Sequence, residues 1–128
     1  MIIGTGIDIV EIPRIETLAK RFPRFAERIL TPAEQALYRK RSASSAFLAT
    51  RFAGKEAALK ALGCGLREGI AWHDMEILPN ELGQPKLSLS GGTLARLQRL
   101  TPGARACLHV SLSDSKELAV AHVIVEAR

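Results

Sequence analysis

The sequence predicts an α+β fold, in which an antiparallel sheet packs against one long central helix within a single domain spanning residues 1–128. Three observations lead to this prediction. Helix-like and strand-like segments occur in separate blocks rather than in a regular strand–helix alternation, which is typical of α+β proteins. Residues 46–62 are apolar on nearly all sides, as expected of a buried helix. Two strand-like runs, at 106–113 and 118–126, close the chain as an expected antiparallel hairpin.

The N-terminal part of the chain predicts one strand followed by short helices. Residues 2–10 are rich in Ile and Val, which favours a strand. A proline early in the segment 13–20 fits the first turn of a helix, and a short helical turn is expected within 25–30. The segment 31–41 begins with Thr-Pro-Ala-Glu, the pattern of a capping box, and therefore predicts another helix.

The C-terminal part predicts the central helix, two hairpins and one further helix. Helix 46–62 is expected to end at the glycines that follow it. Strands at 75–78 and 87–89 are separated by a turn-rich segment, which predicts a hairpin. The segment 93–100 has the periodicity of an amphipathic helix, and the closing hairpin follows it.

The composition indicates a globular protein with an excess of positive charge. Of the 128 residues, 47% are hydrophobic and 24% are charged, and the net charge is +5. Such a surplus favours an anionic partner, for example nucleic acid, a phosphorylated cofactor or an acidic protein. Aromatic residues make up only 5% of the chain, which argues against single-stranded nucleic-acid binding by base stacking.

The sequence has no feature typical of a membrane or secreted protein. No apolar run approaches the length needed to cross a bilayer, and no leader with a basic and then an apolar region is visible. Cys64 and Cys107 lack metal-type spacing, and free thiols are typical of reducing compartments. We therefore expect a cytoplasmic protein with no membrane partner.

Two carboxylates lie in apolar surroundings. Asp8 interrupts the first strand, and because side chains alternate along a strand it is expected to face the opposite side from Ile7 and Ile9. Glu56 lies within the apolar helix. Because a buried carboxylate is unfavourable unless it is paired, hydrogen-bonded or bound to a metal, the two suggest a site for a hard divalent cation if they converge. The ordinary alternatives are a solvent-facing Asp8 and a surface ion pair between Glu56 and Lys60, which lie four residues apart on one helix face.

His109 and a basic cluster complete the candidate residues. His109 lies on the polar row of a strand, which is either the solvated face of a sheet or, with a protonated imidazole, a phosphate contact. The basic residues between positions 14 and 28, interleaved with two phenylalanines, form either a solvated face or a docking surface for an acidic partner. No Walker-type phosphate loop or complete dinucleotide fingerprint occurs.

Five ordered motifs resemble the holo-[acyl-carrier-protein] synthase family of small bacterial 4′-phosphopantetheinyl transferases over nearly the whole chain. They are Gly4–Ile12 with Arg14-Ile15, Arg24–Thr31, Arg51–Ala57 with Lys60–Gly63, Gly83-Gln84-Pro85, and His109–Ser113. The resemblance implies transfer of the 4′-phosphopantetheine group from coenzyme A to a serine of apo-acyl carrier protein, releasing adenosine 3′,5′-bisphosphate, in support of fatty acid biosynthesis. It also implies a homotrimer with active sites between subunits and no nucleic-acid partner.

The resemblance also implies roles for individual residues. Asp8 and Glu56 match the family's Mg²⁺ ligands, and Lys60 matches a catalytic lysine near the coenzyme A phosphates. The coenzyme A site is expected to include Arg51, Lys60, Gly63, Pro85 and His109, with Pro85 toward the adenine and His109 toward the 3′-phosphate. Carrier-protein docking is expected of Arg14, Arg21, Arg24 and Phe25 on one docking helix. Attack by the serine hydroxyl needs a base, for which Glu56 and a metal-bound water are both candidates.

Two positions depart from the family pattern, and two other functions remain open. Gly54 stands where a slightly larger residue, often alanine, is usual in the family, so a looser helix is expected. Asp114 stands where some members have a second histidine, and it receives no role. A basic module that binds RNA or DNA explains the charge but leaves Asp8 and Glu56 unexplained. A metal-dependent phosphodiesterase is the other alternative, and it would use the same two carboxylates.

Overall fold

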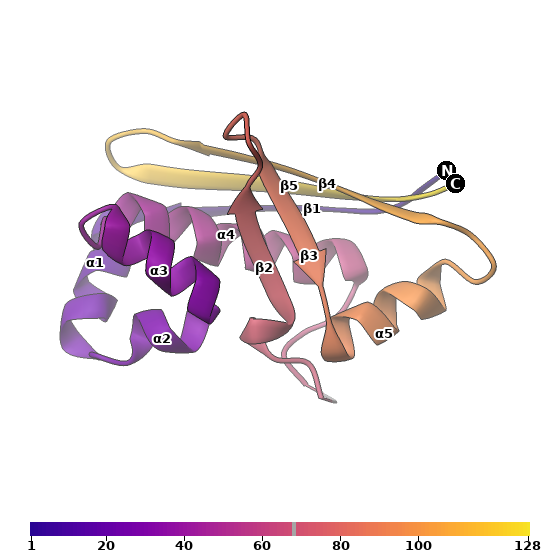
Figure 1. The fold of residues 1–128 in the computed structure, drawn as a ribbon, viewed down its shortest axis with the longest axis horizontal. Helices are drawn as coiled ribbons and strands as arrows, with labels where there is room; N and C mark the ends of the chain where they lie inside the picture. The colour runs from indigo at the N-terminus through magenta and orange to yellow at the C-terminus, as the bar shows by residue number, and fades with distance from the viewer. Residues whose placement is uncertain (68) are drawn as a thin grey trace.

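A sheet and a set of helices form separate layers in the computed structural model, which describes residues 1–67 and 69–128 (Figure 1). The strands of the larger sheet are all antiparallel and follow the order β1 (Ile2–Glu11), β5 (Leu118–Ala127), β4 (Ala106–Asp114). A separate antiparallel hairpin consists of β2 (Met75–Pro79) and β3 (Pro85–Leu89). The predicted α+β class, with an antiparallel sheet against a long helix, is confirmed.

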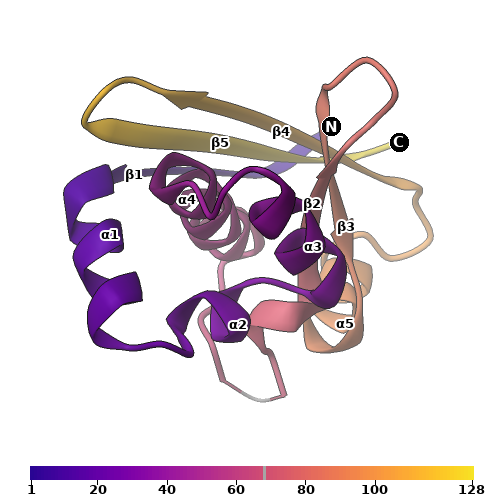
Figure 2. The ribbon, with the colours of Figure 1, turned by 60° about the vertical axis from the view of Figure 1, so that its left-hand side comes forward.

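The helices lie on one side of the larger sheet, as Figure 2 shows. They are α1 (Ile12–Arg21), α2 (Phe25–Ile29), α3 (Pro32–Lys40), α4 (Ser45–Leu62) and α5 (Gly91–Leu100), with a 3₁₀ turn, η1 (Trp72–Asp74), before β2. Both hydrogen bonds of the capping box predicted for α3 are present. Helix α5 begins two residues earlier than predicted, because Asp74 Oδ2 accepts a hydrogen bond from Gly92 N (3.1 Å) and satisfies a free N–H group of its first turn.

Glycines in β1 allow its backbone to meet the backbone of α4. A Cβ atom on Gly4 would collide with the carbonyl oxygen of Ala61, and one on Gly6 would collide with that of Ala57. These oxygens belong to a helix and cannot rotate away, so no side chain fits at either position. The contact brings the middle of β1 against the C-terminal half of α4.

The side chains of β1 alternate between an inner face, toward α4, and an outer face. Ile7 and Ile9 are 62% and 59% exposed on the outer face, together with Leu118 of β5. Asp8 and Val10 point inward. The predicted alternation is confirmed, because the Asp8 carboxylate lies on the inner face and Ile7 and Ile9 lie on the outer face. We call Ile7, Ile9 and Leu118 the outer apolar surface.

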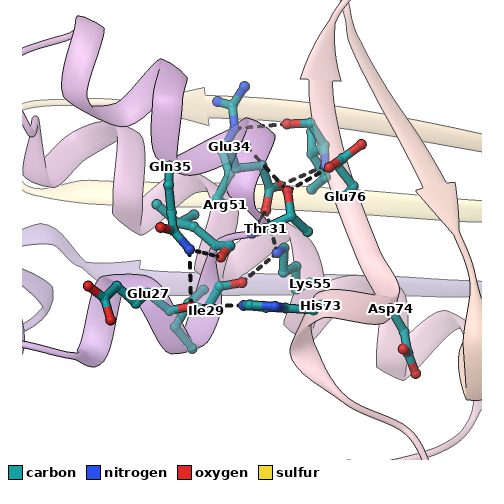
Figure 3. Close-up of polar contacts among 12 residues, drawn as sticks. Glu27, Ile29, Thr31, Glu34, Gln35, Arg51, Lys55, His73, Asp74 and Glu76 are labelled. Atoms are coloured by element: carbon teal, nitrogen blue, oxygen red, sulfur yellow. Dashed lines mark hydrogen bonds and ion pairs between the residues drawn. The ribbon is translucent and has the colours of Figure 1, made fainter.

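A buried ion pair holds the other side of α4 (Figure 3). Lys55 Nζ donates to Glu34 Oε1 and to the carbonyl oxygen of Ile29, each at 2.5 Å, and the side chains of Lys55 and Glu34 are fully buried. Glu34 also accepts hydrogen bonds from Ile77 N (2.8 Å) and Thr31 N (2.9 Å). Burial lowers the pKa of Lys55, and the charge of Glu34 opposes that shift. The pair therefore ties α4 to α2, α3 and β2.

The helix α4 is unbroken at Gly54, where a looser helix was expected. A Cβ atom at this position would collide with Cδ1 of Ile77 and would lie 3.4 Å from Cδ2 of Leu112. The glycine therefore lets the β2 side chain Ile77 lie directly on the helix.

We expect Gly6→Ala to destabilise the fold by about 3 kcal/mol, the upper part of the usual range for overpacking, because the new methyl group meets a helix carbonyl rather than a flexible side chain. Urea unfolding measures the change in the free energy of unfolding. Gly65→Ala is the matched control, since a Cβ atom there meets nothing within 4 Å. Equal free energies of unfolding of the two variants would show that β1 can move away from α4 without loss of stability.

Candidate active site

The contact between β1 and α4 brings Asp8, Glu56 and Lys60 to one place. Lys60 Nζ lies 3.1 Å from Asp8 Oδ1 and donates to the carbonyl oxygen of Ile7 at 2.9 Å. Glu56 is half-buried, as expected, one turn before Lys60 on the same helix face. Among the ion pairs of the described residues, Lys60 pairs with Asp8 and not with Glu56. The Asp8 side chain is 16% exposed and that of Lys60 is 53% exposed, so the cluster lies at the protein surface.

The charges in this cluster favour an added cation. Burial raises the pKa of Glu56, the neighbouring charge of Asp8 raises it further, and Lys60 opposes both effects. Two carboxylates and one ammonium group leave the cluster negatively charged when all three are ionised. A cation near Asp8 and Glu56 would remove the repulsion between them.

The donor set fits a magnesium ion that is only partly coordinated by protein. Within residues 1–67 and 69–128, no group of three or more His, Cys, Asp or Glu side chains is placed to hold a metal. Asp8 and Glu56 would thus supply two ligands and leave the remaining positions to substrate oxygens and water. Mg²⁺ characteristically binds through one or two carboxylates together with phosphate and water.

Arg51 does not point toward this cluster. Its guanidinium group lies over the Phe47 ring, 4.1 Å from the centroid, and its Nε donates to the carbonyl oxygen of Ile77 at 3.4 Å. Arg51 precedes Glu56 by five residues, which places it about 140° further round the helix. Burial lowers the pKa of Arg51 to about 10, so the group remains charged at neutral pH.

Arg51 and Pro85 share a cavity of about 560 Å³ between the start of α4, the β2–β3 hairpin and the end of β4. Arg41 adds a second guanidinium group to its wall, and Phe47 adds an aromatic surface. Asp114, to which the sequence assigns no role, lines the same cavity. Two residues predicted to bind coenzyme A therefore lie together, in a cavity with both cationic and apolar walls.

His109 lies on the outer face of the sheet, away from α4. Its Nε2 is 3.0 Å from Glu126 Oε1, and hydrogen bonds from His109 and Arg128 lower the pKa of Glu126. Within one chain, the sheet separates His109 from Asp8.

Gly63, the remaining residue predicted to bind coenzyme A, ends α4 as expected, with a left-handed φ of 66°. It lies beside Arg96 of α5, at the opposite end of α4 from the cavity that contains Arg51. The predicted coenzyme A residues are thus distributed over four places in one chain: the Asp8 cluster, the Arg51 cavity, the outer face and the end of α4.

The predicted docking residues occupy two helices rather than one. Arg14 and Arg21 belong to α1, whereas Arg24 caps α2 and Phe25 is its first residue. The prediction of a single docking helix is therefore wrong. Helix α1 ends at Arg21, because Pro23, two residues later, cannot donate a backbone hydrogen bond.

The surface between these two helices contains a hollow of about 440 Å³ that is lined by apolar side chains and by two arginines, Arg24 and Arg28. Phe25 is half-buried and packs against Phe52, with ring centroids 6.1 Å apart. Phe22, for which no docking role is predicted, is 50% exposed and lies under the guanidinium group of Arg21. Its position beside arginines in the sequence is the signal that identifies it as a further docking candidate.

Comparison with known families places this geometry in a defined group. The family model described as the 4′-phosphopantetheinyl transferase superfamily matches residues 4–121. A holo-[acyl-carrier-protein] synthase from Methylobacterium sp. (strain 4-46) is 50% identical over 99% of this chain and 96% of its own length. One from Mesorhizobium japonicum is 47% identical over 99% of this chain and 94% of its own.

Solved structures of similar proteins have the same fold. Holo-[acyl-carrier-protein] synthase from Neisseria meningitidis superimposes with a TM-score of 0.85 at 35% identity, covering 98% of this chain and 99% of the other. The synthase from Bacillus anthracis, in complex with coenzyme A (3′,5′-ADP), gives a TM-score of 0.81 at 37% identity, covering 100% and 99% of the two chains.

Replacing Glu56 by Gln is expected to stabilise the metal-free protein at neutral pH. Folding raises the pKa of Glu56 above its ordinary value of 4.5, so stability that is present below this value is lost as the pH rises through the folded-state pKa. Urea unfolding with a chelator present should show E56Q to be more stable than wild type at neutral pH, with the difference vanishing in acid. Glu81→Gln, at an exposed position, should show no such gain, and a destabilised E56Q at neutral pH contradicts the prediction.

Proposed function

The chain belongs to the 4′-phosphopantetheinyl transferase superfamily, and we infer that it is a holo-[acyl-carrier-protein] synthase. The enzyme transfers the 4′-phosphopantetheine group of coenzyme A to a serine of apo-acyl carrier protein and releases adenosine 3′,5′-bisphosphate. Its reaction supplies the carrier protein that fatty acid biosynthesis requires. The observation that supports this chemistry in the structure is the convergence of Asp8, Glu56 and Lys60 at the contact between β1 and α4.

The reaction is the attack of a serine hydroxyl oxygen on the phosphorus atom that carries the pantetheine arm. A new oxygen–phosphorus bond forms, the pyrophosphate bond breaks, and the leaving group is adenosine 3′,5′-bisphosphate. Lys60 neutralises negative charge on the phosphate oxygens, in the way that positioned cations stabilise phosphoryl transfer. The serine proton passes to Glu56 or to a water beside it. Burial of Glu56 and the neighbouring charge of Asp8 raise its pKa, which favours acceptance of a proton by this carboxylate.

Mg²⁺ is the cofactor that this site fits. Asp8 and Glu56 would hold the ion, which when bound neutralises charge on the pyrophosphate. Lys60 lies 3.1 Å from Asp8 in the described structure, so it would share that carboxylate with the ion or turn toward substrate. Its exposed side chain has the freedom to do so.

Coenzyme A extends from this cluster over the other predicted positions. The cavity with Arg51 and Pro85 suits the adenosine part, because it combines guanidinium groups with an aromatic wall. Gly63 lies at the end of the helix that carries Lys60. His109 on the outer face fits a contact with the 3′-phosphate from a neighbouring copy of the chain.

The protein forms a homotrimer with its active sites between subunits. The outer apolar surface supports assembly, since large apolar side chains gathered on one exposed face typically mark an interface. The position of His109 on that same face supports shared sites. Light scattering at micromolar concentration should give the mass of three chains, and a monomer mass would exclude the shared site.

The enzyme acts in the cytoplasm. Cys64 and Cys107 are both free, as is typical of proteins in reducing compartments. Within the described residues, no helix combines the length and apolar character of a membrane span.

One assay distinguishes this function from the two alternatives. The protein is incubated with coenzyme A, Mg²⁺ and an apo-acyl carrier protein, and the mass of the carrier is measured. A gain of one phosphopantetheine group identifies the transferase. Hydrolysis of coenzyme A with an unmodified carrier identifies a phosphodiesterase, and neither change, combined with salt-sensitive binding of nucleic acid, identifies a binding module.

Asp8→Ala and Glu56→Ala should each reduce transfer by more than about 100-fold, since loss of a direct ligand exceeds the usual effect of an outer-shell change. The carrier mass assay measures the rate, and circular dichroism confirms that each variant remains folded. Glu81→Gln serves as the control for loss of a surface carboxylate. Turnover within a few-fold of wild type in either alanine variant would exclude the proposed metal site.

Reversing charge on the docking surface should affect one substrate only. Acyl carrier proteins are acidic, and attraction between opposite charges mainly raises the association rate and weakens with salt. The variant Arg14→Glu with Arg24→Glu should therefore raise KM for the carrier strongly and leave KM for coenzyme A nearly unchanged. Arg105→Glu is the control, because that residue is exposed and distant in sequence from α1 and α2. Equal changes in both KM values, or no change in either, would show that the basic cluster is only a solvated face.

A further inference from the structure

Three arginines converge on a small hollow at the C-terminal end of α4, outside the Asp8 cluster. The hollow has a volume of about 150 Å³, and Arg67, Arg96 and Arg99 line it together with Gly63 and Cys64. Arg67 belongs to the segment after α4, whereas the other two belong to α5. Residues distant in sequence thus bring three guanidinium groups to one place.

The ordinary explanation, a cation at the end of a helix, accounts for Arg96 and Arg99 but not for Arg67. A cation is favourable at the C-terminal end of a helix, and Arg96 Nε donates to the carbonyl oxygen of Leu62, the last residue of α4, at 2.9 Å. This bond leaves the terminal nitrogens of Arg96 directed elsewhere, one of them 3.5 Å from where a Cβ atom of Gly63 would lie. Arg99 lies in the last turn of α5, whose C-terminal end also favours a cation. Arg67 lies outside any helix, and the helix ends do not explain why it meets the other two.

Among the described residues that line the hollow, none is acidic. None of the ion pairs formed among residues 1–67 and 69–128 includes Arg67, Arg96 or Arg99. The charges of Arg96 and Arg67 act on Cys64, where they oppose the rise in the thiol pKa that burial causes. Like charges that share a site repel one another, and an anion in the middle relieves that repulsion.

The two walls of the hollow are held in place before any ligand binds. Asp74 Oδ2 accepts hydrogen bonds from Ala71 N (3.0 Å) and Gly92 N (3.1 Å), which joins the segment before η1 to the start of α5. Thr93 Oγ1 donates to the carbonyl oxygen of Asp74 at 3.0 Å and strengthens the same junction. Guanidinium donors gathered on such a fixed backbone, with Arg96 held by its bond to Leu62, are an arrangement that proteins use to bind phosphate.

We propose that Arg67, Arg96 and Arg99 form a phosphate-binding site at the junction of α4 and α5. Its ligand is a phosphate dianion, either free or as part of coenzyme A, and the site does not use Asp8, Glu56 or Lys60. Arg96 fixes one edge of the site through its bond to α4, while Arg67 and Arg99 close on the anion from the two walls.

Cys64 provides a probe inside the hollow, and Cys107 provides a reference in β4. The rate at which iodoacetamide, a neutral reagent, modifies each cysteine is measured by peptide mass spectrometry at constant ionic strength. Inorganic phosphate should slow modification of Cys64 several-fold and leave Cys107 unchanged. Calorimetric titration with inorganic phosphate gives a second readout that does not depend on the thiol.

The double variant Arg67→Gln with Arg99→Gln should lose the protection of Cys64 and the part of the calorimetric signal that this site contributes. It keeps Arg96, whose loss would disturb the end of α4. Arg105→Gln with Lys116→Gln removes the same charge at exposed positions outside the hollow and should retain both signals.

The source of the phosphate follows from a parallel experiment with coenzyme A. Protection by inorganic phosphate that persists at saturating coenzyme A supports a site for free phosphate. Protection by coenzyme A, with a raised KM for coenzyme A in the double variant, supports a site for one of the phosphates of that molecule. Absence of phosphate binding in the wild type, or equal binding by the double variant, overturns the proposal.

Discussion

The contact between β1 and α4 is the constraint on which the candidate site depends. Gly4 meets Ala61 and Gly6 meets Ala57, so two residues of strand correspond to four residues of helix. The lengths agree, since two strand residues span about 6.6 Å and four helix residues span about 6 Å. The next inward residue of the strand, Asp8, therefore falls on the helix turn that precedes Ala57, where Glu56 lies.

The buried Lys55–Glu34 pair complements this contact from the other side of the helix. A helix that is apolar on nearly all sides has no polar stripe to determine which side faces the sheet. Lys55 is fixed to α3 and β2 through Glu34, and its neighbour Glu56 lies about 100° further round the helix, toward β1. Loss of one member of such a pair leaves an uncompensated buried charge, which usually destabilises a protein by about 3–5 kcal/mol. The pair therefore fixes the orientation of α4 about its own axis, and with it the direction in which Glu56 points.

Local signals in the sequence were sufficient for the elements and for part of the site. The Thr31 capping box and the strand alternation around Asp8 depend on neighbours within four residues, and both were predicted correctly. The Lys55–Glu34 pair joins residues 21 positions apart, and spacing along the chain carries no information about such a contact. A lysine within an apolar helix is nevertheless a signal that a buried partner is needed. The separation of Arg51 from the Asp8 cluster follows from helix geometry, whereas the placement of His109 behind the sheet requires the tertiary fold.

The position of His109 behind the sheet has a consequence for how the protein works in dilute solution. A binding surface divided between the inner face of one chain and the outer face of another exists only while the chains are associated. Catalysis would then fall with dilution more steeply than the number of folded chains, because each chain keeps its structure while the shared surface is lost. If the chains associate through the outer apolar surface as proposed, a compound that covers Ile7 and Ile9 would inhibit the enzyme by separating its subunits, without resembling either substrate.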